Sequence, residues 1–215
     1  MTSDFIWHME DVLDLYERPC DPKRPVICFD ERPCQLIGDA IIPMPIKPGS
    51  PEKEHYEYVR NGTCCIFLAF EPRTGKRMVR VKERRTKADY ADFMKNLANQ
   101  YPDAETILLV QDNLNTHTAG SFYEALPPEE AFEIAKRFEY HYTPKKGSWL
   151  NMAEIELSAL SKQCLDRRIA NMEMLAGEVS AWEHERNAVN ATVRWKFNKC
   201  NAREKLQRHY YNLHN

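Results

Sequence analysis

The chain has 215 residues, 43% of them hydrophobic and 29% charged, with a formal net charge of −2. A chain of this length and apolar content can bury one sizeable core, and we expect a single domain. Its longest apolar run, Cys64 to Phe70, is too short to cross a bilayer, and the charged N-terminus is unlike a signal peptide. We therefore expect a cytoplasmic protein with no membrane partner.

The seven cysteines agree with this expectation. They form no C-x-x-C pair, and their odd number argues against a complete set of intramolecular disulfides. Reduced thiols of this kind are typical of a cytosolic protein.

The first 25 residues form a leading segment. Apolar residues recur at helical spacing from Met9 to Tyr16, and a proline cluster at Pro19, Pro22 and Pro25 then ends the helix. The pattern predicts a helix and linker over residues 1–25 and one larger domain over residues 26–215.

A strand and a hairpin are predicted next. Val26 to Glu31 is an apolar run that ends in acids, and a proline-rich loop at residues 43–55 follows it. Thr63 to Phe70 is rich in β-forming residues and is expected to pair, across a turn, with Arg77 to Lys82. Because both faces of Arg77 to Lys82 carry charge, we expect an edge strand open to solvent.

Helices and strands alternate in the rest of the chain. Thr86 and Asp89 resemble a capping box at the start of a helix, and Ile107 to Val110 is predicted as a buried strand. Beyond it the pattern predicts, in order, helices at 121–125 and 129–137, a strand at 138–142, and helices starting near Ser148, Met172 and Asn201. The predicted fold class is α/β with a helical C-terminal tail.

Two of the predicted strands end in an aspartate, Asp30 and Asp112. Ligands bind at the carboxyl ends of strands in α/β sheets, and two carboxylates there raise each other's pKa unless a cation lies between them. Mg²⁺ is the natural candidate because it prefers hard oxygen ligands. A structural alternative stays open, because an aspartate at a strand end also forms turns, and Asp112 or Asn113 could cap the following helix.

A third carboxylate would complete such a site. The helix predicted after Ser148 offers Glu154 and Glu156, which lie on opposite flanks of its apolar stripe at about 100° per residue. Helical periodicity alone leaves both glutamates open.

Three motifs together resemble the catalytic domain of mariner-like bacterial insertion-sequence transposases, in the DDE transposase and integrase superfamily. They are FDE at 29–31, QDNLNTH at 111–117 and TPKKGSWLNMAE at 143–154. The resemblance implies a ribonuclease H-like mixed sheet flanked by helices. The 41 residues between Asp112 and Glu154 exceed the family's usual gap, which suggests an insertion around residues 126–137.

The same resemblance assigns the site. It implies that Asp30, Asp112 and Glu154 are the catalytic and metal-binding acids, with two Mg²⁺ or Mn²⁺ ions as cofactors. Glu154 is preferred because the family's glutamate stands three residues after the asparagine at Asn151, and Glu156 is then expected at the surface.

The implied function is metal-dependent DNA strand cleavage and strand transfer in DNA transposition. Its implied partners are DNA, at the transposon ends and the target, and a second copy of the chain or a separate DNA-binding subunit. No N-terminal helix-turn-helix module is recognisable in the sequence. An alternative therefore stays open, in which the chain is a non-catalytic remnant that pairs with a full-length transposase and modulates it.

Further residues are candidates for supporting roles. Asn113 and His117 share a motif with Asp112 and are expected to contact the acids or to face DNA, with a plain surface position as the alternative for His117. Residues 73–87 hold eight basic residues and one acid, and we call this segment the basic ribbon. Its candidates for contacting the DNA backbone are Arg80, Lys82, Arg84 and Arg85, although a charged hairpin is also often a solvated edge.

Overall fold

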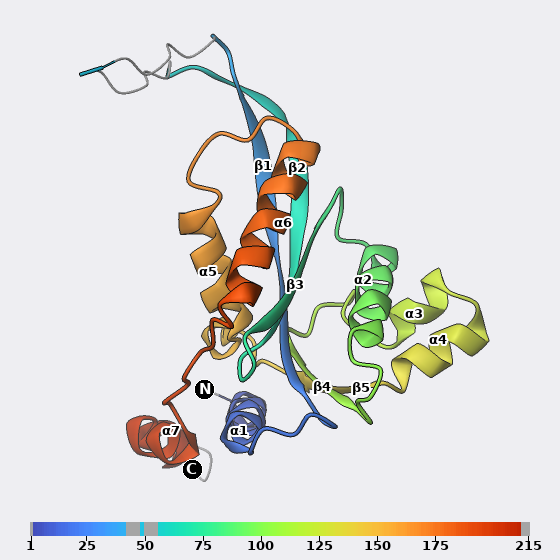
Figure 1. The fold of residues 1–215 in the computed structure, drawn as a ribbon. Helices are drawn as coiled ribbons and strands as arrows, with labels where there is room; N and C mark the ends of the chain where they lie inside the picture. Colours follow the sequence, from blue (N-terminus) through green and yellow to red (C-terminus); the bar gives the residue numbers. More distant parts are fainter. Residues whose placement is uncertain (1, 42–47, 50–55, 212–215) are drawn as a thin grey trace.

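The computed structural model describes residues 2–41, 48–49 and 56–211, so most of the proline-rich loop at 43–55 lies outside the described residues. A mixed sheet runs through the molecule in the order β3-β2-β1-β4-β5 (Figure 1). Its strands are β1 (Val26–Asp39), β2 (Tyr58–Glu71), β3 (Lys76–Lys82), β4 (Ile107–Gln111) and β5 (Phe138–Tyr142). β1, β2 and β3 pair antiparallel, whereas β1, β4 and β5 pair in parallel.

Helices cover both faces of the sheet, as expected (Figure 1). One face packs in a single apolar core against α1 (Ser3–Glu17), α5 (Ala153–Gln163), α6 (Met172–Ala188) and α7 (Lys199–Lys205). The other face packs in a second core against α2 (Lys87–Asn99), α3 (Gly120–Ala125) and α4 (Pro128–Ala135). A short helix, α8 (Gln207–Tyr211), follows α7. Among the described residues, no helix combines the length and apolar character that a membrane span requires.

Strand β1 is longer than the sequence pattern predicts. It does not end at Asp30 but continues to Asp39, because β2 goes on pairing with it as far as Tyr58. Pro33 is tolerated inside this strand because β4 pairs with β1 only at residues 26–28. Beyond that point one edge of β1 is open, and a missing N–H can face it.

The capping box at the start of α2 is confirmed, since Thr86 and Asp89 exchange side-chain to backbone hydrogen bonds. By contrast, the helix expected from Ser148 begins five residues later. Ser148–Leu150 forms a 3₁₀ turn instead, and α5 starts at Ala153. Residues 126–137, expected as an insertion, form α4 with its flanks, and Ala131 of this helix is buried in the core with α2.

Strand β3 lies at the edge of the sheet, as expected, but it is not open to solvent. Arg77, Met78 and Val79 are buried, and α6 packs along the strand. Alternation of charge misleads here because the guanidinium of Arg77 finds acidic and amide partners inside the fold, which its position in the strand does not reveal.

Candidate active site

The alternation of side chains along β1 determines the face of the sheet on which Asp30 lies. Ile27 and Phe29 pack in the core with α2, whereas Cys28 packs in the core with α5. Since successive side chains of a strand point to opposite faces, Asp30 follows Cys28 onto the α5 face. Asp30 is half-buried, and the side-chain amide of Asn151, just before α5, donates a hydrogen bond to its carboxylate.

Asp112 holds the matching position on the neighbouring strand. The last residues that pair between β1 and β4 are Cys28 and Val110, and each aspartate stands two residues beyond its member of that pair. Val110 packs in the α5 core, as Cys28 does. The parallel register therefore brings Asp30 and Asp112 to the same face and the same end of two adjacent strands.

Glu154 comes to these aspartates from the first turn of α5. Asn151 fixes the start of this helix on β1, because its side-chain amide donates to the carbonyl oxygen of Phe29 (2.7 Å) and to Oδ2 of Asp30 (3.4 Å). Its side-chain oxygen accepts from the backbone N–H of Ala153 (3.1 Å). Asn151 is fully buried, so these three bonds satisfy an amide that would otherwise destabilise the fold.

The electrostatics of Asp30 show that the three acids act on one another. Burial, together with the negative charges of Glu154 and Asp112, raises the pKa of Asp30 to about 7. The backbone N–H of Glu31, which donates to Oδ1 of Asp30 (2.8 Å), opposes this rise. A carboxyl group with such a pKa gains from a cation placed among the acids.

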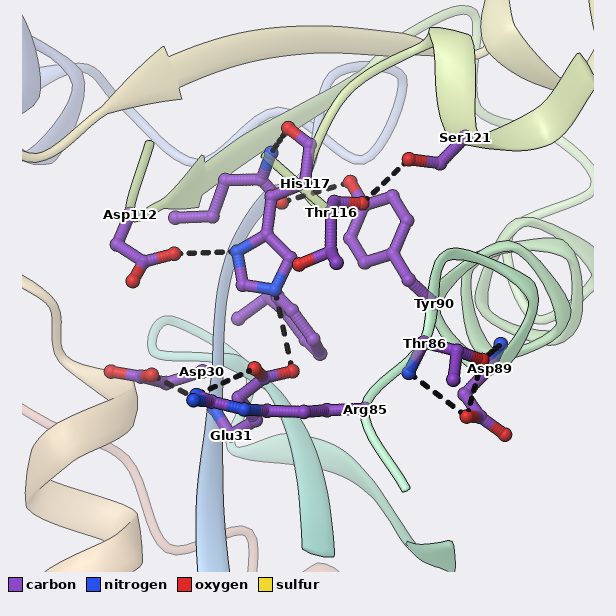
Figure 2. A network of polar contacts seen from close by, with 12 residues as sticks. Asp30, Glu31, Arg85, Thr86, Asp89, Tyr90, Asp112, Thr116, His117 and Ser121 are labelled. Carbon is purple, nitrogen blue, oxygen red and sulfur yellow. Dashed lines mark hydrogen bonds and ion pairs between the residues drawn. The ribbon is translucent and has the colours of Figure 1, made fainter. Parts of the chain in front are cut away.

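His117 connects Asp112 to a fourth acid, Glu31 (Figure 2). Its Nδ1 lies 2.5 Å from Oδ1 of Asp112, and its Nε2 lies 3.3 Å from Oε2 of Glu31. The imidazole is buried and stacks on the ring of Tyr90 at 5.0 Å between centroids. Burial lowers the pKa of His117, but the hydrogen bonds to Asp112 and Glu31 outweigh it and raise the pKa to about 9. His117 is thus a buried bridge between two acids and not a surface histidine.

Sequence patterns did not single out Glu31, Arg85 and Tyr90 as a group. Glu31 leaves β1 on the face opposite to Asp30, and Nη1 of Arg85 approaches Oε1 of Glu31 at 3.4 Å (Figure 2). Tyr90 donates to the side-chain oxygen of Gln111 at 2.9 Å. The sequence did hold a signal for Glu31, namely the two consecutive acids Asp30 and Glu31. Because side chains alternate along a strand, one of these acids lies on each face of the sheet.

The surface position expected for Glu156 is wrong. Its side chain is 1% exposed and lies between two arginines of other elements. Nε of Arg77 lies 2.9 Å from Oε2 of Glu156, and Arg186 donates to both carboxylate oxygens at 3.0 and 2.8 Å. These partners are far away in the sequence, which is why helical periodicity alone did not reveal them.

The structural alternatives for the two aspartates are excluded. Asp30 forms no turn, since it lies inside a continuous strand. Neither Asp112 nor Asn113 caps the following helix, because α3 begins at Gly120 and no side chain caps it. Asp112 bonds His117 instead, and Asn113 is exposed beside it in a groove.

The basic ribbon is largely matched by acids. Arg80 pairs with Glu183, and Lys82 pairs with Asp92. Arg85 pairs with Glu31, whereas Arg84 is exposed. The side chains of Arg80 and Arg85 are 50% and 60% exposed, so both reach solvent while they are paired.

The acids fit a divalent metal by their chemistry. Asp30, Asp112 and Glu154 offer the hard oxygen donors that Mg²⁺ and Mn²⁺ prefer. In the described part of the chain, no three His, Cys, Asp or Glu side chains are already arranged to hold an ion. Binding would therefore draw the carboxylates together, and the raised pKa of Asp30 shows which charge the ion would relieve most.

Comparison with known families identifies the superfamily of the chain. The model of a family described as DDE superfamily endonuclease matches residues 25–176. The chain belongs to the DDE endonuclease superfamily. Asp30, Asp112, Glu154 and His117 all lie inside the matched segment. No curated protein sequence matches the chain.

Solved structures show the same fold. This chain superposes on the "Mos1 mariner paired end complex with Mn" with a TM-score of 0.57 and 15% identity, over 88% of this chain and 59% of that chain. For the "Mos1 transposase paired-end complex with left transposon end", the TM-score is 0.58 and the identity is 15%, over 88% of this chain and 59% of that chain. For the "Mos1 Strand Transfer Complex", the TM-score is 0.55 and the identity is 16%, over 86% of this chain and 53% of that chain.

At such identities the likeness establishes a shared fold. The ribonuclease H-like sheet and the mariner-like catalytic-domain fold expected from the sequence motifs are therefore confirmed. The chain spans 59% of the length of the first two transposase chains that it matches.

Proposed function

We propose that the chain is the catalytic part of a cytoplasmic transposase of an insertion sequence, which cuts DNA strands and joins them to a target in a reaction that depends on Mg²⁺ or Mn²⁺. Asp30, Asp112 and Glu154 are the proposed catalytic and metal-binding residues. One observation supports this proposal: the parallel register of β1 and β4 sets Asp30 and Asp112 at matching positions, and Asn151 reaches Asp30 from just before the first turn of α5, which carries Glu154.

In the absence of a cation, burial and the charges of Glu154 and Asp112 disfavour the charged form of Asp30, and this supports a metal-dependent reaction. When bound, a pair of such ions activates water or a DNA 3′-hydroxyl and stabilises the leaving oxygen. The chain's own residues prepare the acids for this. His117 orients the carboxylate of Asp112, and Asn151 holds the first turn of α5 against the backbone of β1, so that Glu154 faces Asp30.

The partners follow from the proposed reaction. The Mos1 structures that share the fold are described as paired-end and strand-transfer complexes, and we infer DNA as the substrate of this chain, with a second copy of the chain or a separate DNA-binding subunit as its protein partner. Arg80, Lys82, Arg84 and Arg85 remain proposed contacts for the DNA backbone. For the three paired residues, phosphate would replace or join a carboxylate.

A nicking and strand-transfer assay on duplex DNA tests the proposal. Wild type with Mg²⁺ or Mn²⁺ is expected to cut, whereas Asp30→Asn and Glu154→Gln are expected to lose the activity by several orders of magnitude while remaining folded. Asp166→Asn, which removes an exposed acid remote from the site, is the matched control. Cutting by Asp30→Asn at the wild-type rate would refute the proposal. If wild type is inert, but binds a full-length transposase and changes its rate, the chain is the non-catalytic partner.

A further inference from the structure

Two grooves adjoin the acids, one lined by Glu154 and the other by Asp112. The first is lined by Glu154 of α5 together with Glu31, Arg32, Pro33, Leu157, Ser158, Ser161 and Lys162. The second is lined by Asp112 together with Asn113, the segment from Thr143 to Ser148, and the first turns of α1. Asp30 joins them, because its carboxylate accepts from the backbone of Glu31 and interacts electrostatically with both Glu154 and Asp112.

Four exposed cations line these grooves, Arg32 and Lys162 in the first and Lys145 and Lys146 in the second. Within residues 2–41, 48–49 and 56–211, none of the four forms an ion pair with an acid. They differ in this respect from Arg80, Lys82 and Arg85 of the basic ribbon, whose charges are matched by Glu183, Asp92 and Glu31. A phosphate arriving in either groove would therefore displace no carboxylate.

The backbone at Lys146 points to the same grooves. Pro144 and Gly147 close a tight turn, in which the carbonyl oxygen of Pro144 accepts from the N–H of Gly147 (2.8 Å). Lys146 is the third residue of this turn and has a φ of 65°. Glycine or asparagine suits that position, and a lysine there is strained. Such strain at an exposed, unpaired cation beside the acids is best explained by a ligand that the side chain contacts.

Hydroxyl groups add to the first groove. Ser158 and Ser161 stand one and two turns after Glu154 along α5 and line the groove with Lys162. Serine hydroxyls and lysine ammonium groups are the side-chain donors that proteins offer to backbone phosphates. The hydroxyl of Ser161 already donates to the carbonyl oxygen of Leu157 (2.6 Å), so Ser158 is the hydroxyl that adds to Arg32 and Lys162 as a phosphate donor in the first groove.

We propose that the two grooves form one continuous track for a DNA strand, in which Lys145 and Lys146 hold phosphates on the Asp112 side and Arg32 and Lys162 hold phosphates on the Glu154 side. The inference rests on the proposed function, because the acids lie at the middle of the track. It adds a set of contacts that is distinct from the basic ribbon. It also sets the path of the DNA strand, from the 3₁₀ turn at Ser148–Leu150 toward the C-terminal end of α5.

Binding of a duplex of arbitrary sequence, measured at several salt concentrations in EDTA so that no cleavage takes place, tests the track. The track variant is Arg32→Gln, Lys145→Gln, Lys146→Gln and Lys162→Gln together. Its matched control removes four cations that pair with acids elsewhere, with Arg18→Gln, Lys95→Gln, Lys136→Gln and Arg167→Gln. Both variants change the net charge equally. The slope of log K against log salt should fall by roughly 0.9 for each phosphate that the track variant no longer binds, with little change in the control.

Lys146→Asn provides a test that misfolding does not mimic. Asparagine tolerates the positive φ, so the variant should melt at the wild-type temperature or above it, yet bind DNA several-fold more weakly. Lys136→Asn, at an exposed lysine beyond α4, is the control for binding. Unchanged affinity in Lys146→Asn and in the track variant, or an equal loss in the matched control, would overturn the track.

The track and the proposed function fail separately. If Asp30→Asn cuts DNA as wild type does while the track variant loses its salt dependence, the catalytic assignment is wrong and the track stands. If wild type cuts DNA and the track variant binds as wild type does, the track is wrong and the catalytic assignment stands.

Discussion

Glu154 and Glu156 leave the same helix two residues apart and meet opposite surroundings. Glu154 is exposed beside Asp30, whereas Glu156 is buried against Arg77 and Arg186. One glutamate therefore serves the site and the other holds α5 to β3 and α6.

Substitution of these glutamates should separate function from stability. Glu156→Gln leaves the buried Arg77 without a full counter-charge, and we expect the free energy of unfolding in urea to fall by about 3–5 kcal/mol. Glu154→Gln should change it by less than about 0.5 kcal/mol, as at other exposed positions. Equal losses in the two variants would contradict the division of roles.

Divalent metal should stabilise the folded chain, because an ion bound only by the folded state shifts the equilibrium by mass action. Mg²⁺ or Mn²⁺ is expected to raise the melting temperature of wild type in a thermal shift experiment. Asp112→Asn should largely remove that response, since it deletes a charged ligand with little change in size. Asp166→Asn is expected to respond as wild type does, and the same shift in all three proteins would argue against a site at Asp112.

The raised pKa of Asp30 predicts how stability depends on pH in EDTA. Because the folded pKa is about 7 and the ordinary value is 3.8, the unfolded chain releases this proton first, and stability falls as the pH rises from about 4 to 7. Asp30→Asn lacks this loss. The difference in the free energy of unfolding, variant minus wild type, should therefore grow with pH by about 1.36 kcal/mol per unit of pKa difference. It should level off above pH 7. A constant difference over that pH range would show that Asp30 is not perturbed.

Asn151 should matter for metal binding as well as for stability. Asn151→Ala removes two hydrogen bonds to β1 and one to the backbone N–H of Ala153 in α5, and we expect a loss of about 1–3 kcal/mol together with a weaker metal-induced shift. Asn187→Ala is the matched control, because Asn187 also bonds a strand backbone, at Arg77, but lies away from the acids. It should lose stability and keep the metal response.

Much of the architecture followed from local patterns. The buried run from Ile107 to Val110, the helical spacing after Met9 and the box formed by Thr86 and Asp89 all depend on residues close in sequence, and each appears as predicted. Asp30 and Asp112 were predicted after two apolar strand runs, and the parallel pairing of β1 with β4 places them side by side.

The remaining features depend on contacts between distant segments. Pairing of β2 with residues 31–39 extends β1 far past Asp30, and nothing between Glu31 and Asp39 signals a partner. Arg77 and Glu156 are each ambiguous alone, and their burial follows only when β3 and α5 come together under α6. His117 likewise becomes a bridge only because β1 brings Glu31 next to it.

The two aspartates of the site lie beside a short junction between β1 and β4. β1 pairs with β2 at twelve positions but with β4 at three, and the two aspartates stand at the open end of that short junction. Parting of the sheet there would separate Asp30 from Asp112 while the hairpins on one side and β4 with β5 on the other stayed intact. An ion bound by both aspartates would hold β1 and β4 together at this junction. The apparent affinity for the ion would therefore include the free energy of closing the junction. Hydrogen exchange should therefore slow in β4 on metal binding more than it slows in β2.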